Sequence, residues 1–426
     1  MKRSLKIFIG ILIGFVAITS CENQAEELTS TGIESSLLSK YISVGGSLTA
    51  GYTNGGLYRE GQLASYPNLV AQQAGVKFDQ ALFPVGQENG TGYWATTQNN
   101  TSLQFDKISD KLAILTTSPL TLAKYSGSVA NNYGVVGLRV SDVNKAGFGN
   151  AKTQGFNPFF ERILPAGKEE TSYTDFVKES NATFFTVSIG EQDILSYAAS
   201  GGKTSMTETS SFALNIQKLL DALVANNAKG VLTNIPNVLD LPYFNFYTFQ
   251  ELAKNVGTTD IFITTGNGIV RAATANDKIL MEAIQNVGKT NTANQKKGFS
   301  MTYPLTNEEV LDKDEISIIA SRLNDFNGVL KFEASKRGIL LADLNGLYAQ
   351  VKSKTYTLNG VQFDNSLFTG GFFSLDGINP TPRGSAVIAN EVIKVINENY
   401  KNSLKTAIPS LDVSKFEALK VKLTQF

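Results

Sequence analysis

The sequence contains no histidine. Because an imidazole is the usual proton acceptor for an attacking serine, this absence excludes a serine–histidine catalytic pair. Cysteine occurs only once, at Cys21, so no disulfide can form within the chain. Neither sign of charge is in excess, with 38 basic and 38 acidic residues, and no basic block is present that would neutralise phosphates. We therefore expect no nucleic-acid partner.

Long apolar runs are also absent, apart from one near the start of the chain. This run, Ile7–Ile18, follows a cationic start and is too short to span a bilayer comfortably, which is typical of a signal peptide over residues 1–20. It leads into the letters ITSC, which resemble the bacterial lipobox and predict a lipidated Cys21. An ordinary signal peptide with an incidental cysteine is the alternative. We expect a polar tether at 21–36. We also expect the protein to be an exported lipoprotein of the outer membrane, and the cell surface is one place where it could be exposed.

Five apolar runs bounded by turn residues are present in the rest of the chain. They are nearly continuous rather than alternating, which is typical of parallel strands buried on both faces. The runs are Tyr41–Val44, Tyr133–Leu138, Thr183–Ile189, Gly230–Ile235 and Gly338–Leu344. Helical patterns separate them, and the alternation predicts an α/β fold.

Three helical patterns are the clearest. One apolar face comprises Phe212, Ile216, Leu219, Leu220 and Leu223, and another comprises Ile316, Ile319, Leu323, Phe326 and Leu330. A last helix is capped by Thr381, with Pro382 in its first turn and Ala389, Val392, Ile393 and Ile396 on its buried face. A helix-like stretch also runs from Ser47 toward Ala74.

The predicted strands and helices form one domain at 37–400, followed by a C-terminal extension at 401–426. Two stretches interrupt the alternation and are interpreted as insertions, at 87–132 and 243–306. With 42% hydrophobic residues, a chain of 426 residues can bury a large core. No tandem repeat is found, and no transmembrane segment is predicted beyond the signal.

Four ordered segments carry residues suited to acyl chemistry. They are VGGSLTAG with Ser47, VVGLR with Gly137, VSIGEQD with Gln192, and SLDGINPTPRG with Asp376 and Asn379. Their order and content resemble the four blocks of the SGNH (GDSL-type) hydrolases, in particular the lipoprotein branch of the Bacteroidetes. The resemblance spans about Tyr41 to Tyr400.

This resemblance implies a flavodoxin-like three-layer α/β/α sandwich with a central parallel sheet, and hydrolysis of esters or acyl groups. It assigns the nucleophile to Ser47 and the triad acid to Asp376. The oxyanion hole would consist of the Ser47 and Gly137 amides and the Gln192 side chain. The sequence shows no spacing typical of metal ligands, and we expect no cofactor and no metal.

Three positions depart from the family pattern. Gly46 precedes the serine where relatives have aspartate or asparagine, Gln192 replaces an asparagine, and Asn379 occupies the position of the catalytic histidine. A neutral amide cannot accept a proton near neutral pH, although its carbonyl can accept a hydrogen bond from Ser47. Losing the histidine of a serine triad costs on the order of 10⁶ in turnover. The sequence therefore predicts an impaired hydrolase.

Other interpretations of these residues remain open. Asp376, Glu191 or a lysine from an insertion could replace the base. Alternatively, Gly46 eases a tight turn, Gln192 is a buried amide, and Asn379 caps the turn that follows it. An aromatic group could line an acyl pocket, but loop packing is favoured for Tyr243, Phe244, Phe246, Tyr247 and Phe249.

Two functions are compatible with this sequence. The favoured one is a catalytically impaired lipoprotein, anchored to the membrane through Cys21, that binds a glycan, a lipid or an outer-membrane protein partner. The alternative is an active esterase, lipase-type acylhydrolase or carbohydrate deacetylase that uses Ser47 with a base other than histidine.

Overall fold

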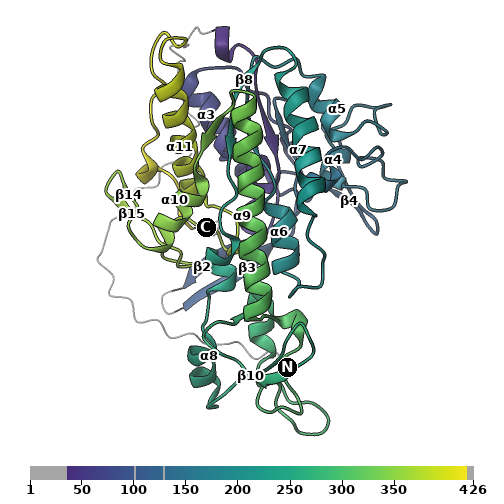
Figure 1. Ribbon diagram of the computed structural model, residues 1–426, viewed down its shortest axis with the longest axis vertical. Helices are drawn as coiled ribbons and strands as arrows, with labels where there is room; N and C mark the ends of the chain where they lie inside the picture. The colour runs from purple at the N-terminus through teal and green to yellow at the C-terminus, as the bar shows by residue number, and fades with distance from the viewer. Residues whose placement is uncertain (1–35, 100–101, 128–129, 420–426) are drawn as a thin grey trace.

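The computed structural model describes residues 36–99, 102–127 and 130–419 (Figure 1). The predicted signal peptide at 1–20, Cys21 and the predicted tether as far as residue 35 lie outside these residues. Within the described ranges, no helix combines the length and the hydropathy needed to cross a membrane.

A parallel sheet of five strands lies at the centre, in the order β13-β8-β7-β1-β6. The strands are β1 (Tyr41–Gly45), β6 (Asn132–Gly134), β7 (Phe184–Ser188), β8 (Lys229–Thr233) and β13 (Leu340–Ala342). In the centre of the sheet, Val44 pairs with Val187 on one side and with Tyr133 on the other. The five predicted strands are therefore confirmed, although β6 ends earlier than expected because the chain turns away after Gly134.

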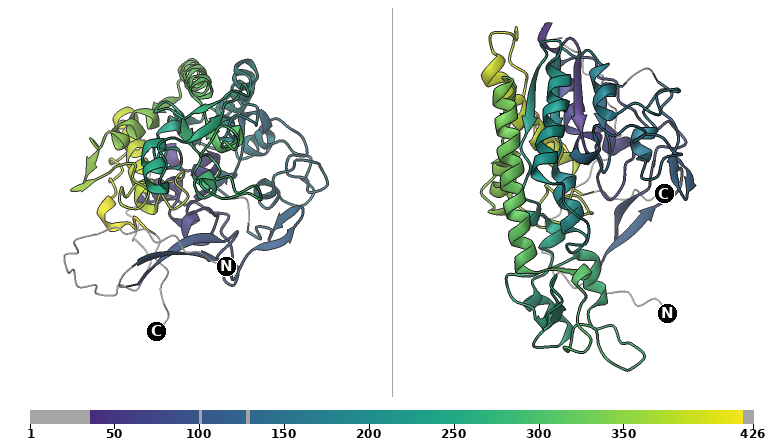
Figure 2. Two further views of the ribbon diagram at one scale, coloured as in Figure 1. Left: turned by 90° about the horizontal axis from the view of Figure 1, so that it is seen from below. Right: turned by 45° about the vertical axis from the view of Figure 1, so that its right-hand side comes forward.

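Helices flank this sheet on both sides, as Figures 1 and 2 show. The main ones are α3 (Tyr66–Ala74), which packs on α11 (Pro382–Tyr400), and α7 (Thr209–Val224), which packs on α9 (Lys313–Lys336). The predicted apolar faces are confirmed: Phe212 of α7 stacks on Phe326 of α9 with ring centroids 3.8 Å apart. The predicted α/β/α architecture is therefore confirmed.

The predicted start of α11 is confirmed. The Thr381 hydroxyl accepts the Gly384 N–H at 3.0 Å. Pro382 occupies the first turn, where a backbone N–H has no intrahelical acceptor and its absence costs no hydrogen bond. Residues after α11 fold back along it: the Asn390 and Asn397 amides donate to the carbonyls of Leu411 and Ile408, each at 2.9 Å. The C-terminal extension is thus attached to the domain as far as it is described.

The helix-like stretch predicted from Ser47 toward Ala74 is wrong as a single element. It consists of α1 (Ser47–Ala50), α2 (Arg59–Leu63) and α3. The first break lies at Gly51, which has a φ of +80° and would place a Cβ only 2.4 Å from the Gly61 carbonyl oxygen. Glycine is required there because the two backbones approach too closely for a side chain.

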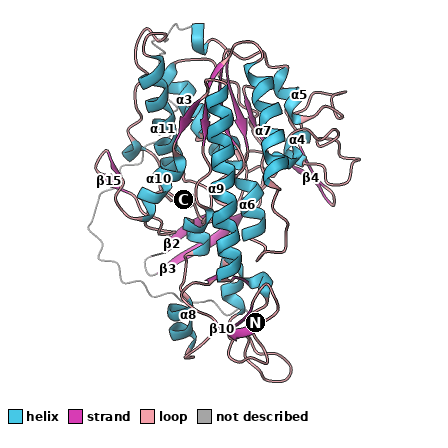
Figure 3. Ribbon diagram, in the orientation of Figure 1, coloured by secondary structure: helices cyan, strands magenta, loops and turns pink. Residues whose placement is uncertain are grey.

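The stretch 87–132 contains two antiparallel hairpins, which Figure 3 labels at β2, β3 and β4. The hairpins are β2 (Tyr93–Asn99) with β3 (Ser102–Ile108), and β4 (Ile114–Thr117) with β5 (Leu120–Leu122). The stretch 243–306 forms much of the lower end of the molecule in Figure 1. Its elements include α8 (Phe249–Val256), β9 (Phe262–Thr264), β10 (Val270–Ala272) and β11 (Lys278–Ile279), which pairs with β12 (Val310–Leu311).

Shorter elements complete the described chain. The helices are α4 (Pro158–Glu161), α5 (Tyr173–Lys178), α6 (Glu191–Ala198) and α10 (Leu344–Lys352), and a hairpin pairs β14 (Thr357–Leu358) with β15 (Val361–Gln362). Of these, α6 is central to the site because it begins directly after β7, the strand beside β1.

Candidate active site

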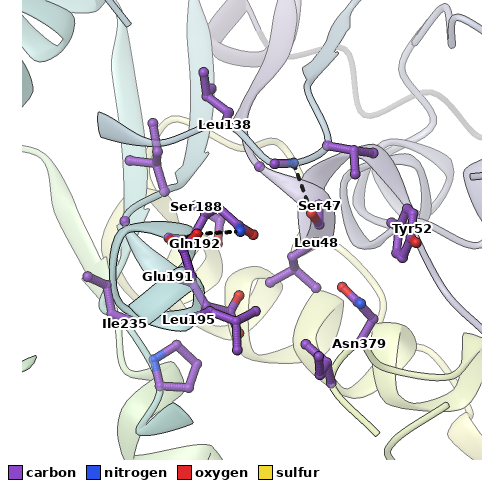
Figure 4. Close-up of a pocket in the computed structure, with 18 of the residues that line it drawn as sticks. Ser47, Leu48, Tyr52, Leu138, Ser188, Glu191, Gln192, Leu195, Ile235 and Asn379 are labelled. Carbon is purple, nitrogen blue, oxygen red and sulfur yellow. Dashed lines mark hydrogen bonds between the residues drawn. The ribbon is translucent and has the colours of Figure 1, made fainter. Parts of the chain in front are cut away.

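A cavity of about 320 Å³ lies at the carboxyl ends of β1, β7 and β8. In open α/β sheets, ligands bind at this edge, where the loops after neighbouring strands converge. Ser47, Gly137, Gln192 and Asn379 all line it, so the structure brings together one residue from each of the four predicted segments (Figure 4). Asp376 lies behind Asn379 and is hydrogen-bonded to it.

The two glycines before Ser47 differ in what the backbone demands of them. At Gly45, which has a φ of +153°, a Cβ would lie 2.0 Å from the carbonyl oxygen of Ser188. At Gly46, φ is −91°, and the nearest atom to an added Cβ is the Leu138 carbonyl oxygen at 3.8 Å. Glycine is therefore required at position 45, where any Cβ would collide with the backbone. At position 46 a Cβ would fit without a collision.

Backbone donors surround the Ser47 hydroxyl. The Gly137 N–H donates to Ser47 Oγ at 3.3 Å, from a turn in which Gly137 has a φ of +74°. The Asn157 amide holds this turn by donating to the Val136 carbonyl at 2.9 Å. Because Ser47 begins α1, the first N–H groups of that helix have no intrahelical acceptor. Backbone N–H groups therefore lie where an oxyanion at Ser47 would need donors.

The Gln192 side chain lines the cavity but is held by its own helix. Its Nε2 donates to Ser196 Oγ at 2.8 Å, and that hydroxyl donates to the Gln192 carbonyl, also at 2.8 Å. One amide hydrogen is thus engaged within α6 rather than directed at Ser47. Sequence reasoning missed Ser196, although its spacing of four residues from Gln192 is the helical signal that could have revealed it.

Asp376 accepts hydrogen bonds from several groups at once. Its Oδ1 accepts the N–H groups of Ile378 at 2.9 Å and Asn379 at 2.8 Å. Its Oδ2 accepts the Gly55 N–H at 3.0 Å and the Asn379 Nδ2 at 3.1 Å. With its nitrogen on Asp376, the buried Asn379 amide directs its oxygen toward the cavity (Figure 4). An imidazole bonded to the same carboxylate would present a basic nitrogen there.

Ser47 and Asn379 are not hydrogen-bonded to each other in the part of the chain that is described, so the predicted contact between them is not formed. The asparagine oxygen remains available to another donor in the cavity. Asp376, another candidate for a replacement base, does not line the cavity, and both of its oxygens accept hydrogen bonds.

The loop that carries Asp376 and Asn379 is fixed by a segment near the start of the domain. Thr53 Oγ1 donates to the Pro380 carbonyl at 2.8 Å, the Asn54 N–H donates to Ser374 Oγ at 2.9 Å, and the Leu375 N–H donates to Asn54 Oδ1 at 3.1 Å. Sequence reasoning missed these residues. Because the partners lie more than 300 positions apart, no local pattern could have revealed them.

Glu191, at the first position of α6, is the one charged residue among the described residues that line the cavity. It is half-buried, and nothing in the described ranges forms a hydrogen bond or an ion pair with its carboxylate. Burial, and to a lesser extent the negative charge of Asp376, raise the pKa of Glu191 to about 7. No lysine lines the cavity among the described residues, so Glu191 is the one candidate for a replacement base that lines it there.

The aromatic group of the 243–306 stretch does not contribute to the cavity. Tyr243, Phe244 and Phe249 are buried in the main hydrophobic core. Loop packing, the favoured interpretation of these residues, is confirmed. Over the described residues, no three acidic or cysteine side chains are grouped in a way that could hold a metal ion.

The chain matches the GDSL-like lipase/acylhydrolase family over residues 41–392. Among solved structures it is similar to an acetyl xylan esterase, AlAXEase, at 12% sequence identity and a TM-score of 0.29. That match covers 62% of this chain and 78% of the esterase, and at this level it carries no argument about activity. No curated protein matches the sequence significantly.

Proposed function

The chain belongs to the GDSL-like lipase/acylhydrolase family, and we propose that this member uses its cavity to bind a ligand that it does not hydrolyse. The observation that carries this proposal is the pairing of Asn379 with Asp376, at 3.1 Å between Nδ2 and Oδ2. It leaves an amide oxygen where the reaction needs a base, and this oxygen does not take up a proton near neutral pH. Without a proton acceptor, Ser47 is a weak nucleophile.

The cavity remains suited to binding. Its volume of about 320 Å³ lies at the lower end of the range for small-molecule sites, which are mostly apolar with a few polar groups that fix orientation. Leu48, Leu138, Leu195 and Ile235 contribute apolar surface. The Ser47 hydroxyl, which accepts the Gly137 N–H, contributes a donor.

The location of the protein is part of the same proposal. The sequence before the domain supports a lipid anchor on Cys21 and an outer-membrane position, where a glycan, a lipid or a membrane protein is the partner. Metabolic labelling with a fatty acid tests the anchor: we expect label in the native chain and none in Cys21→Ser. Equal labelling of both proteins would contradict it.

A second candidate function is an acyl hydrolase in which Glu191 is the base. It is favoured by the pKa of about 7 for a carboxyl group that lines the same cavity as Ser47. The ionised Glu191 would take the proton of Ser47 as its Oγ bonds to the acyl carbon, and would return it to the leaving alcohol. Water would then release the acid from Ser47. General bases work best when their pKa lies near the working pH.

One experiment separates the two candidates: hydrolysis of p-nitrophenyl acetate by the native protein, Ser47→Ala and Glu191→Gln between pH 5 and 9. For a binding protein, we expect equal background rates in all three, and no labelling of Ser47 by a fluorophosphonate. Turnover that rises through pH 7 and is lost in both variants would instead establish the hydrolase. Cooperative thermal melts serve as the control for folding.

A further inference from the structure

Three acceptor groups in the lining of the cavity accept no hydrogen bond from the described residues, and they belong to Glu191, Gln192 and Asn379. Gln192 and Asn379 each donate one amide hydrogen, to Ser196 at 2.8 Å and to Asp376 at 3.1 Å, and the oxygen of each amide accepts no hydrogen bond from the described residues. Within the described residues, no hydrogen bond and no cation acts on the Glu191 carboxylate. A half-buried carboxylate without a hydrogen bond is costly, and its cost falls when a ligand supplies donors.

The charge of the cavity also selects among ligands. No lysine or arginine is present among the described lining residues, so an anionic ligand would meet Glu191 without a counter-charge. Like charges within a few ångströms repel strongly in a site of low dielectric constant. A cation, by contrast, would pair with Glu191, which occupies the same cavity as Asn379 and Ser47 (Figure 4).

We propose that the cavity binds a primary ammonium group carried on a small apolar body, with Glu191 as its counter-ion. This inference rests on the proposed function, in which the cavity is a binding site. An ammonium group has three donors and no acceptor, which matches the carboxylate of Glu191 and the free oxygens of Gln192 and Asn379. Hydrogen bonds between ions are about twice as strong as neutral ones. The leucine and isoleucine side chains of the wall would cover the apolar body.

Binding should depend on pH through Glu191. Burial is the main reason that the pKa of Glu191 is raised to about 7, and the negative charge of Asp376 adds to it. The other titratable group that interacts with Glu191 is the buried Tyr348. Tyr52, in the same cavity, has a pKa of about 12, because burial disfavours its anion, and is therefore neutral. As the pH rises through 7, Glu191 ionises and the affinity for a cation increases.

The test compares three probes of similar size but different charge: n-butylammonium, 1-butanol and butyrate. Their affinities are measured by saturation-transfer NMR titrations of the native protein at pH 5.5 and pH 8. We expect n-butylammonium to bind about tenfold more tightly than 1-butanol at pH 8, and about tenfold more weakly at pH 5.5 than at pH 8. Butyrate should bind most weakly.

A matched pair of variants tests the role of Glu191. Glu191→Gln should reduce the affinity for n-butylammonium to that for 1-butanol and abolish its pH dependence. Glu398→Gln, at an exposed position of α11, should change neither. Equal binding of the ammonium and the alcohol by the native protein would overturn the inference but leave the cavity as a binding site. Failure of all three probes to bind would contradict both the inference and the proposed function.

Discussion

The two sides of the cavity provide their functional groups in different ways. On the Ser47 side, the groups that matter are backbone N–H donors, placed by the end of β1 and by the Gly137 turn, with 3.3 Å between the Gly137 nitrogen and Ser47 Oγ. On the Asn379 side, the decisive group is one side chain, held by Asp376. Backbone chemistry persists as long as the fold does, whereas side-chain chemistry is lost with a single residue.

Asp376, on the Asn379 side, has a structural role besides the one that a serine triad gives it. In a serine triad, the acid orients the histidine. Here the same carboxylate accepts three backbone N–H groups as well as the Asn379 amide, and one of these, from Gly55, belongs to a distant segment. Asp376 therefore stabilises the loop even without a histidine to orient.

Asn379→His gives the largest expected effect, because it changes only the Asn379 side and places an imidazole there. Its imidazole can donate to Asp376 and present a basic nitrogen to Ser47. We expect p-nitrophenyl acetate hydrolysis to rise on the order of 10³-fold, within the usual contribution of a positioned base. The fluorophosphonate should then label Ser47. A gain that persists in Asn379→His with Ser47→Ala would show that the serine side takes no part.

Asp376→Ala should cause the largest loss of stability. Three backbone N–H groups and the Asn379 amide would lose their acceptor, and we expect a decrease of about 4 kcal/mol in the free energy of unfolding. Urea denaturation measures it. The matched control is Asp314→Ala on the exposed start of α9, which should change stability by less than about 1 kcal/mol. Equal effects of the two substitutions would refute a structural role for Asp376.

Glu191→Gln should change how stability depends on pH. The pKa of Glu191 is raised from 4.5 to about 7 in the folded protein, so the folded state retains the proton that the unfolded state loses. Native stability should therefore fall as the pH rises from 4.5 to 7, and stay level above. At about 1.4 kcal/mol per pH unit, the variant should be up to about 3 kcal/mol more stable than the native protein at pH 8. At pH 4 the two proteins should be equally stable, and urea denaturation at both pH values measures this.

Gln192→Asn in the Asn379→His background tests whether the oxyanion side is also impaired. The shorter amide cannot reach Ser196 in the same way, which frees its nitrogen for the cavity. We expect a further rise in kcat of about tenfold, less than the 10² to 10³ attributed to a full oxyanion-hole donor. An unchanged kcat would mean that the backbone donors near Ser47 suffice.

Ser47→Ala should have the smallest effect. The hydroxyl accepts one hydrogen bond, from Gly137 at 3.3 Å, and faces the cavity. We expect the free energy of unfolding to change by less than about 0.5 kcal/mol, as is usual for substitutions outside the core. A larger loss in urea denaturation would indicate that the serine is kept for stability.

The sequence by itself determined the parts of this protein that depend on local pattern. Five buried strands, the apolar faces of α7 and α9 and the Thr381 cap were all predicted from short stretches, because apolar periodicity and capping act over a few residues. The order of the motifs also indicated which residues share the cavity. The lack of a histidine was certain from composition alone.

Only the tertiary structure decided what those residues do. The attachment of Gly55 to Asp376, the orientation of the Asn379 amide and the burial of Glu191 all depend on segments that are distant in the chain. The engagement of Gln192 by Ser196 is local, because the two residues are four apart on one helix. A pKa is set by the surroundings of a group in space, so the raised pKa of the unpaired Glu191 carboxylate follows from the folded structure and not from the sequence.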